Sequence, residues 1–186
     1  DNANALDIGT GDGKRFAELS GLITKGHGVD VDPKMIEVAN GLKVPNITFS
    51  CDDEHLKKVE GSYSIITNRH APFDLAAIES KLEKKGYFIT QQVGEKNMDN
   101  VLGPIGTHGR KAVINKAMFD NVGLRLLAFL EYNVDYRVDD IESLLFWLNA
   151  LDVLHAGFDS TIATEDVNIL NKVLEGGVHK DKFVTN

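Results

Sequence analysis

Three glycines stand at every second position near the start of the chain, in the stretch DIGTGDGKRF (residues 7–16). The apolar run before them, residues 4–8, predicts a buried strand, and residues 14–24 carry apolar side chains at helical spacing. Glycine adopts backbone conformations that other residues avoid, and it lets a ligand approach the main chain. A glycine turn between a strand and a helix also directs N–H groups of the helix toward a ligand. This feature predicts an α/β sheet with a ligand at the turn.

The alternation of short apolar runs and helical patterns continues to residue 93. A helix with Asp32 as its N-cap and Pro33 in its first turn is predicted, as is a second helix that begins after Asp74 and ends at Gly86. Such an alternation of strands and helices favours a mostly parallel sheet with helices on both faces. The further predicted strands are 27–31, 46–50, 63–67 and 86–93, and the predicted buried helix positions are Phe16, Leu19, Ile23, Met35, Val38, Ala39, Leu42, Leu75, Ile78 and Leu82.

The pattern changes after Gly94. Residues 94–109 have the composition of a loop, and residues 111–122 predict a helix. Residues 124–138 predict an extended strand, and KFVTN at the end predicts the start of another. Two more helices are predicted, one around 164–175 and one with its buried stripe at Ile141, Leu144, Leu145 and Leu148.

Charge and cysteine content exclude several classes of protein. The formal net charge is −8, which disfavours nucleic acid as the default partner. The one cysteine, Cys51, rules out an internal disulfide and a cysteine-based zinc site, in keeping with a cytoplasmic location. No apolar run reaches the ~18 residues of a membrane span, so no membrane partner is expected. The histidines are scattered, with no H-x-x-x-H pair, and no metal is predicted.

The glycine spacing distinguishes between nucleotide-binding motifs. The dinucleotide fingerprint G-x-G-x-x-G needs a third glycine where Lys14 stands, and no G-K-[ST] follows for a phosphate-binding loop. The spacing present is D-x-G-x-G-x-G, from Asp7 to Gly13. Further acidic residues end the next two predicted strands, at Asp30 and at Asp52-Asp53. The carboxyl ends of parallel strands share one edge of a sheet, where ligands of open α/β sheets bind.

This spacing, with the acidic strand ends, resembles motif I and the following motifs of the class I S-adenosylmethionine-dependent methyltransferases. The resemblance covers residues 4–93 by motif and the rest by architecture. It implies a Rossmann-like, seven-stranded sheet of order 3-2-1-4-5-7-6 with strand seven antiparallel. It also implies one methyltransferase domain over residues 1–186, with a cofactor-binding half (1–93) and a substrate-recognition half (94–186). We expect both termini to be truncated.

The resemblance implies S-adenosyl-L-methionine as cofactor and gives roles to the strand ends. Asp7 would serve the ammonium group of the cofactor, Asp30 both ribose hydroxyls, and Asp52-Asp53 the adenine. The residues expected to bind the cofactor are Asp7, Gly9, Thr10, Gly11, Asp30, Val31, Asp52, Asp53 and Asn68.

No catalytic residue is predicted, because a methyl group on a sulfonium is already activated and the protein mainly positions the acceptor. Asn68 starts TNRHAPFD, which lacks the N-P-P-[YF] spacing of amino-group methyltransferases, so that role is not carried over. His70 is either a base or a loop residue bonded to backbone. Arg69 either binds an acidic substrate or pairs on the surface. Gln91 and Gln92 either orient a substrate or stabilise a turn.

We therefore expect a methyltransferase that acts on a small-molecule acceptor. The layout of residues 67–97 and 138–151 also resembles the 23S rRNA guanine-N1 methyltransferases, although the cysteines of their zinc module are missing here. An RNA methyltransferase is thus the first alternative, and a non-catalytic S-adenosylmethionine-binding regulatory domain is the second. Trp147 and Leu151 are assigned either to a pocket wall or to core and homodimer packing.

Overall fold

The computed structural model describes residues 3–52, 55–94, 114, 116–119, 121–131, 136–138, 140–150, 165, 167–169, 171 and 183–185. The chain divides into two compact units. Unit 1 is Asp1–Gln92 with Ile114–Ala128, and unit 2 is Val93–Val113 with Phe129–Asn186. Each unit is described by itself. The single domain over 1–186 with halves at 93 and 94 stays a prediction.

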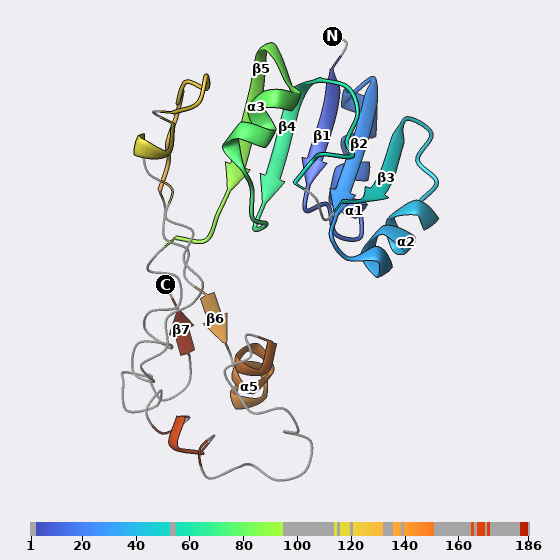
Figure 1. Ribbon diagram of the computed structural model, residues 1–186. Coiled ribbons are helices and arrows are strands. Elements are labelled where there is room, and N and C mark those ends of the chain that lie inside the picture. The colour runs from blue at the N-terminus through green and yellow to red at the C-terminus, as the bar shows by residue number, and fades with distance from the viewer. Residues whose placement is uncertain are drawn as a thin grey trace. The chain divides into compact units, whose positions relative to one another are not determined.

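Unit 1 contains a five-stranded parallel sheet of order β3-β2-β1-β4-β5 (Figure 1). This order confirms the first five strands of the expected sheet, and all strand carboxyl ends lie at one edge. The strands are β1 (Asn4–Ile8), β2 (Lys25–Asp30), β3 (Ile47–Cys51), β4 (Tyr63–Arg69) and β5 (Leu82–Gln91).

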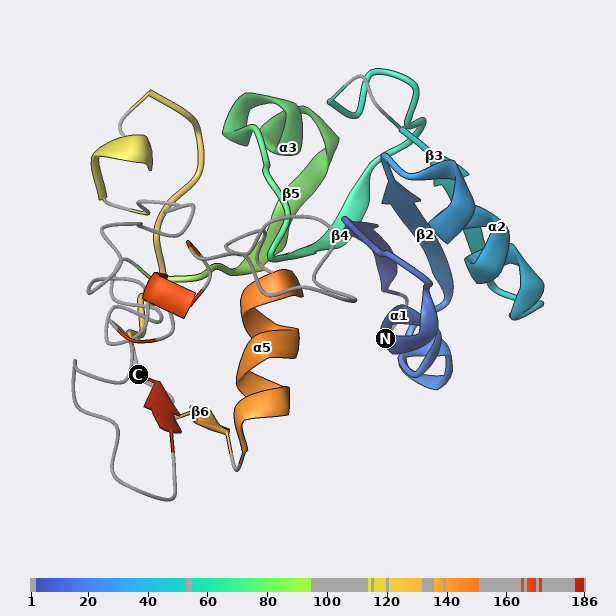
Figure 2. The same cartoon turned by 90° about the horizontal axis from the view of Figure 1, so that it is seen from below.

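Each face of this sheet has its own apolar core. Neighbouring residues of a strand point to opposite faces, so Ala5 belongs to one core and Leu6 to the other. Figure 2 shows α1 (Lys14–Ala17) and α3 (Leu75–Lys81) on opposite sides of the sheet. The core under α1 and α2 (Pro33–Gly41) is formed by Ala5, Phe16, Ile36, Ala39, Ile47 and Phe49. The core under α3 is formed by Leu6, Val29, Leu56, Val59, Tyr63, Ile66 and Ile78.

The predicted helix caps are confirmed. Asp32 Oδ1 accepts from the Lys34 N–H at 2.8 Å, and Pro33 follows as the first helical residue. Asp74 Oδ1 accepts from the Ala77 N–H at 2.9 Å at the start of α3. The short polar side chain satisfies an amide that the helix leaves without a carbonyl, so both helix starts were readable from the sequence.

The predicted helix over 14–24 is wrong in its second half. α1 ends at Ala17, residues Ser20–Leu22 form a 3-10 turn, and Ile23 is extended. Gly21 disfavours a continuous helix, and the Thr24 N–H bonds the Ala3 carbonyl at 2.9 Å, which draws the chain into the sheet. Phe16 is buried as predicted, whereas Leu19 is 38% exposed.

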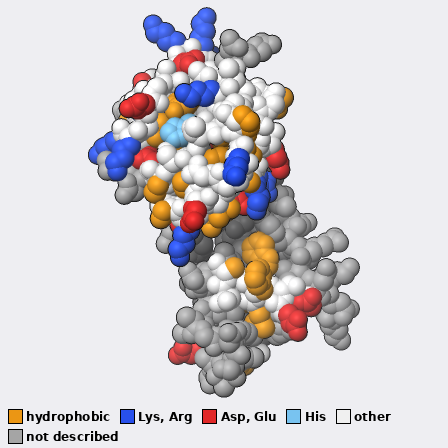
Figure 3. All heavy atoms as spheres, turned by 90° about the vertical axis from the view of Figure 1, so that its right-hand side faces the viewer, with side chains coloured by type: hydrophobic (Ala, Val, Ile, Leu, Met, Phe, Trp, Pro, Cys, Tyr) orange, Lys and Arg blue, Asp and Glu red, His pale blue; other side chains and the backbone are white. Residues whose placement is uncertain are grey.

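The predicted buried stripe of α2 is confirmed at Ala39 and wrong at Met35 and Val38, which are exposed. Ile36, which was not predicted, is buried instead. The sequence offers apolar residues on two adjacent helix faces, and packing against β2 and β3 selects between them. The face of the molecule in Figure 3 accordingly shows apolar side chains among interspersed basic and acidic ones.

The strand predicted over 86–93 starts earlier, because α3 ends at Lys81 and Leu82 already pairs with Tyr63. A register shift between Tyr63 and Ile65 accommodates the extra residues, so Gly86 lies inside β5. Leu75 and Ile78 are buried as predicted.

In unit 2, β6 (Tyr136–Val138) and β7 (Phe183–Thr185) pair antiparallel as a separate two-stranded sheet. The expected single seven-stranded sheet is therefore not observed in the described ranges. Of the strand predicted over 124–138, residues 124–131 are not in a strand, residues 136–138 form β6, and residues 132–135 lie outside the described residues. Helix α5 (Ile141–Ala150) is confirmed, with Leu144 and Leu148 buried. Helical residues at 165, 167–169 and 171 match the last predicted helix.

Part of the remaining predictions falls outside the described residues. Of the predicted helix over 111–122, the structure describes a 3-10 turn at Lys116–Phe119. Residues 95–109, including the predicted loop, lie outside the described residues, as does Leu151. Among the helices that the structure describes, none has the length and apolar character needed to cross a bilayer.

Candidate functional site

The glycine turn lies between β1 and α1, at the carboxyl edge of the sheet that Figure 2 views. Gly9, Gly11 and Gly13 all have positive φ, at 74°, 58° and 73°. A Cβ on Gly9 would overlap the Cβ of Ala71, in the loop after β4. A Cβ on Gly11 would meet nothing within 4 Å. Gly9 is therefore needed for packing within the protein, and Gly11 leaves main chain bare toward open space.

Several N–H groups of this turn are bonded within the protein. The Gly9 and Thr10 N–H groups both donate to the Val29 carbonyl, at 2.9 and 3.0 Å. The Gly11 N–H donates to Asp30 Oδ2 at 2.8 Å, and the Lys14 N–H donates to Asp12 Oδ1 at 3.2 Å. Phosphate-binding loops present free N–H groups to an anion, and these four N–H groups already have acceptors.

Asp7 lies on β1 opposite Thr67 of β4, whose hydroxyl donates to Asp7 Oδ1 at 2.7 Å. Burial raises the pKa of this carboxyl, and the hydroxyls of Thr67 and Thr10 and the charge of Arg69 act against that rise. Asp30, at the end of β2, adds a nearby negative charge that raises the pKa of Asp7 further. A half-buried carboxylate next to a second one favours a cationic ligand group between them.

Asp30 is held by two backbone amides. Its Oδ2 accepts from the Gly11 N–H at 2.8 Å and its Oδ1 accepts from the Asp32 N–H at 3.0 Å. Each oxygen of a carboxylate can accept more than one hydrogen bond, so both oxygens can still accept from a ligand. Because the backbone holds the carboxylate in place, a ligand would not have to order it on binding.

The three residues expected further along the edge have different positions. Val31 is 69% exposed directly after β2. Asp52 is only 7% exposed, and its Oδ2 accepts from the Leu56 N–H at 2.7 Å, so it stabilises the turn that follows β3. Asp53 lies outside the described residues. The adenine contacts of Asp52 and Asp53 stay predictions.

Asn68 joins three strand ends and is 2% exposed. Its Nδ2 donates to the Ile8 carbonyl at 3.2 Å, and its Oδ1 accepts from Gln92 Nε2 at 2.6 Å and from the Thr90 hydroxyl at 3.2 Å. Gln92 Nε2 also lies 3.1 Å from the Ala71 carbonyl. The structure gives Asn68 and Gln92 the role of fastening the loop after β4. The expected cofactor contact of Asn68 stays a prediction.

The fastened loop carries Arg69 and His70, both exposed. His70 has a φ of 57°, and its N–H donates to the Gln91 carbonyl at 3.0 Å. Partial burial lowers the pKa of the His70 imidazole, and the charges of Arg69 and Arg15 lower it further. The imidazole is therefore mostly neutral at pH 7.

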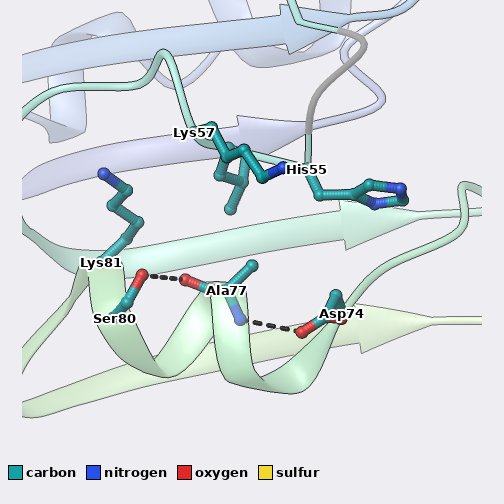
Figure 4. A pocket seen from close by; sticks show the side chains of 7 residues that line it. His55, Lys57, Asp74, Ala77, Ser80 and Lys81 are labelled. Carbon is teal, nitrogen blue, oxygen red and sulfur yellow. Dashed lines mark hydrogen bonds between the residues drawn. The ribbon is translucent and has the colours of Figure 1, made fainter.

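A separate pocket of about 390 Å³ lies between the segment after β3 and helix α3 (Figure 4). Its polar groups are largely used by the fold, because Asp74 caps α3 and Lys81 Nζ donates to the Val59 carbonyl. None of the predicted site residues lines it, and we assign it no function. Its lining is His55, Leu56, Lys57, Asp74, Ala77, Ser80 and Lys81. No group of potential metal ligands gathers anywhere in the described part of the chain.

Sequence reasoning missed several residues that shape the site. Thr67 orients Asp7, Ala71 packs on Gly9, and Arg15 joins Arg69 near His70. Thr67 and Ala71 interact with residues about 60 positions away, so no local pattern could have indicated them. Arg15 stood inside a predicted helix, where an arginine is usually a solvated surface residue.

At the level of sequence, no protein-family model and no curated protein matches this chain. The structure is similar to the crystal structure of the YcgJ protein from Bacillus subtilis, with a TM-score of 0.68 and 18% identity over 99% of this chain and 88% of that one. This similarity and the strand order show a Rossmann-like α/β fold.

Solved S-adenosylmethionine-dependent methyltransferases are also among the similar structures. One is from Clostridium acetobutylicum, with a TM-score of 0.47 and 19% identity over 53% of this chain and 46% of that one. Another is a TehB-like enzyme from Corynebacterium glutamicum, with a TM-score of 0.41 and 23% identity over 48% of this chain and 54% of that one. The matched region thus spans about half the length of each of these two structures.

Proposed function

We propose that this chain is a class I S-adenosylmethionine-dependent methyltransferase (EC 2.1.1). The observation that carries the proposal is the combination of Asp7, the bare main chain at Gly11 and the backbone-held carboxylate of Asp30 at neighbouring strand ends. A turn in which several N–H groups already have acceptors within the protein suits a ligand without phosphates. The two carboxylates suit a ligand with an ammonium group and hydroxyls.

In this proposal each residue meets one part of the cofactor. Asp30 accepts from the ribose hydroxyls, Asp7 serves the ammonium group, and the main chain of Gly9, Thr10 and Gly11 lies beneath the amino-acid end. Val31, Asp52 and Asp53 line the adenine side, and Asn68 acts through the loop that it fastens. The cofactor supplies an activated methyl group when bound, and the protein orients the acceptor and excludes water.

We propose a small molecule as the methyl acceptor and the cytoplasm as the location. Interspersed charges on the face in Figure 3 and the net charge of −8 support a small acceptor over an RNA of the 23S rRNA type. A seven-stranded sheet and a homodimer also belong to this proposal. The second candidate is a regulatory domain that binds the cofactor without transfer.

Binding of S-adenosylhomocysteine, measured by calorimetry, tests the cofactor site. Asp30→Ala is expected to weaken binding by about 1–3 kcal/mol, because it removes a charged hydrogen-bond acceptor. Glu37→Gln on α2 changes an acidic residue outside the proposed site and serves as the control, with unchanged affinity. Equal affinities of Asp30→Ala and the unmodified chain would refute the site.

Transfer is tested separately with labelled cofactor and two acceptor pools, cell-extract metabolites and total RNA. Label in the metabolite pool supports the proposal, and label in RNA supports the alternative acceptor. Tight cofactor binding with label in neither pool would favour the regulatory domain.

A further inference from the structure

The loop after β4 carries positive charge beside the glycine turn. Arg69 ends β4, His70 follows it, and the next residue, Ala71, packs against Gly9. The bonds from Gln92 to the Ala71 carbonyl and from the His70 N–H to the Gln91 carbonyl hold this loop from the β5 side. Arg69 and His70 are thus presented on a fixed backbone, next to the proposed cofactor site.

Arg15, in the first turn of α1 directly after the glycine turn, carries a second guanidinium whose charge acts on His70, and both arginines are exposed. The salt bridge observed in the described ranges joins Lys14 to Asp12 at 2.8 Å, and neither arginine has an acidic partner within 4 Å there. The nearby acids are otherwise engaged, since Asp12 pairs with Lys14 and Asp7 accepts from Thr67. Within the described residues, both guanidiniums are thus without an ion pair.

We propose that Arg15, Arg69 and His70 form an anion-binding subsite that holds a carboxylate or phosphate group of the methyl acceptor, which rests on the proposed function. Guanidinium groups bind both anions through paired, charge-assisted hydrogen bonds. The charges of both arginines disfavour a proton on His70, and a bound anion reverses that effect. The subsite lies at β4, on the other side of β1 from Asp30, so it adjoins the amino-acid end of the proposed cofactor and not its ribose.

The number of charges favours a small acceptor. An RNA ligand gains affinity by neutralising many phosphates, and its binding depends steeply on salt. The proposed subsite has two arginines and one histidine, and on the face in Figure 3 acidic and basic side chains are interspersed. We therefore assign the subsite to one anionic group of a small molecule.

The experiment uses the 186-residue chain saturated with S-adenosylhomocysteine and inorganic phosphate as the probe. Phosphate is titrated while NMR follows the His70 imidazole and calorimetry measures affinity. We expect phosphate to bind and to raise the pKa of His70. Arg69→Gln and Arg15→Gln are each expected to weaken phosphate binding about tenfold. Arg125→Gln, a matched change of an exposed arginine, is expected to leave it unchanged.

Three outcomes overturn the proposal. Absence of phosphate binding, or equal binding by all three variants, refutes the subsite. A loss of S-adenosylhomocysteine affinity in Arg69→Gln, with unchanged affinity for methylthioadenosine, which lacks the carboxylate, would assign the arginine to the cofactor.

A fourth outcome also overturns the proposal. In it, phosphate does not bind, a single-stranded RNA binds with a steep salt dependence, and Arg69→Gln loses the RNA binding. Failure of the proposed function can be distinguished from failure of the subsite, because S-adenosylhomocysteine would then not bind to the unmodified chain. The phosphate titration can in that case be repeated without S-adenosylhomocysteine.

Discussion

Asp7 shows at the scale of one residue how a ligand site conflicts with folding. Its carboxyl is half-buried beside a second carboxylate, and burial raises its pKa despite the hydrogen bond from Thr67. The folded state therefore binds a proton at Asp7 more tightly than the unfolded state does. The contribution of Asp7 to the free energy of unfolding is fully present below the ordinary pKa of an aspartate. It is lost as the pH rises through the raised pKa of the folded state. At pH 7 the ionised carboxylate opposes folding.

Asp7→Asn is therefore expected to raise the free energy of unfolding at pH 7, because the amide oxygen can still accept from Thr67 without the buried charge. The gain should shrink at pH 3, where Asp7 is protonated. Affinity for S-adenosylhomocysteine should fall about tenfold, because its ammonium group loses a charged partner. Denaturant titrations at both pH values and calorimetry measure these effects. Lower stability of the variant at pH 7 would contradict the account.

At the scale of an element, the glycine turn combines two requirements that the sequence motif does not separate. Gly9 and Gly11 have similar positive φ, but a side chain would overlap Ala71 at the first and enter open space at the second. The first glycine thus serves the packing of two loops. The second serves the space in which we place the cofactor.

Alanine at each position should distinguish these roles. Gly11→Ala should cost about 1 kcal/mol of stability, the penalty for a left-handed alanine, and should weaken S-adenosylhomocysteine binding strongly. Gly9→Ala should cost more stability, because it adds the overlap with Ala71. Adding Ala71→Gly removes the overlap, so the double variant Gly9→Ala/Ala71→Gly should have about the same free energy of unfolding as Gly11→Ala. Equal unfolding energies of the two single variants would show that the Ala71 contact is unimportant.

At the scale of the whole molecule, the described residues of the proposed cofactor site all belong to unit 1. Unit 1 also takes a later segment, in which Leu124 packs against the core under α3. Unit 2 holds α5 and the β6-β7 sheet. The division suggests that cofactor binding can be tested apart from acceptor recognition.

A chain ending at residue 131 retains both segments of unit 1 and is expected to bind S-adenosylhomocysteine within about twofold of the full chain, without transferring methyl groups. A chain ending at residue 94 loses Leu124 and should be less stable by about 1 kcal/mol, the contribution of a partly buried leucine. Calorimetry measures the affinity for S-adenosylhomocysteine, and denaturant titration measures the free energy of unfolding. Loss of cofactor binding in the longer chain would show that unit 2 contributes to the site.

Much of unit 1 was predictable because its signals are local. The five strands, their parallel order and the caps at Asp32 and Asp74 agree with the expectation from the sequence and the family resemblance. The second half of the first helix, the buried positions Met35 and Val38 of α2 and the start of β5 were wrong. In each case the local pattern allowed two solutions, and contacts with the sheet selected one.

The sequence by itself determined which side chains stand at the strand ends, because strand periodicity and parallel order bring the carboxyl ends of β1, β2 and β3 to one edge. Only the tertiary structure decided which of their polar groups remain available. The Gly11 N–H bonds Asp30, 19 residues away, and Asn68 bonds the Ile8 carbonyl, 60 residues away. Hydrogen bonds between such distant positions form only when the strands are in register, so no short stretch of sequence records them.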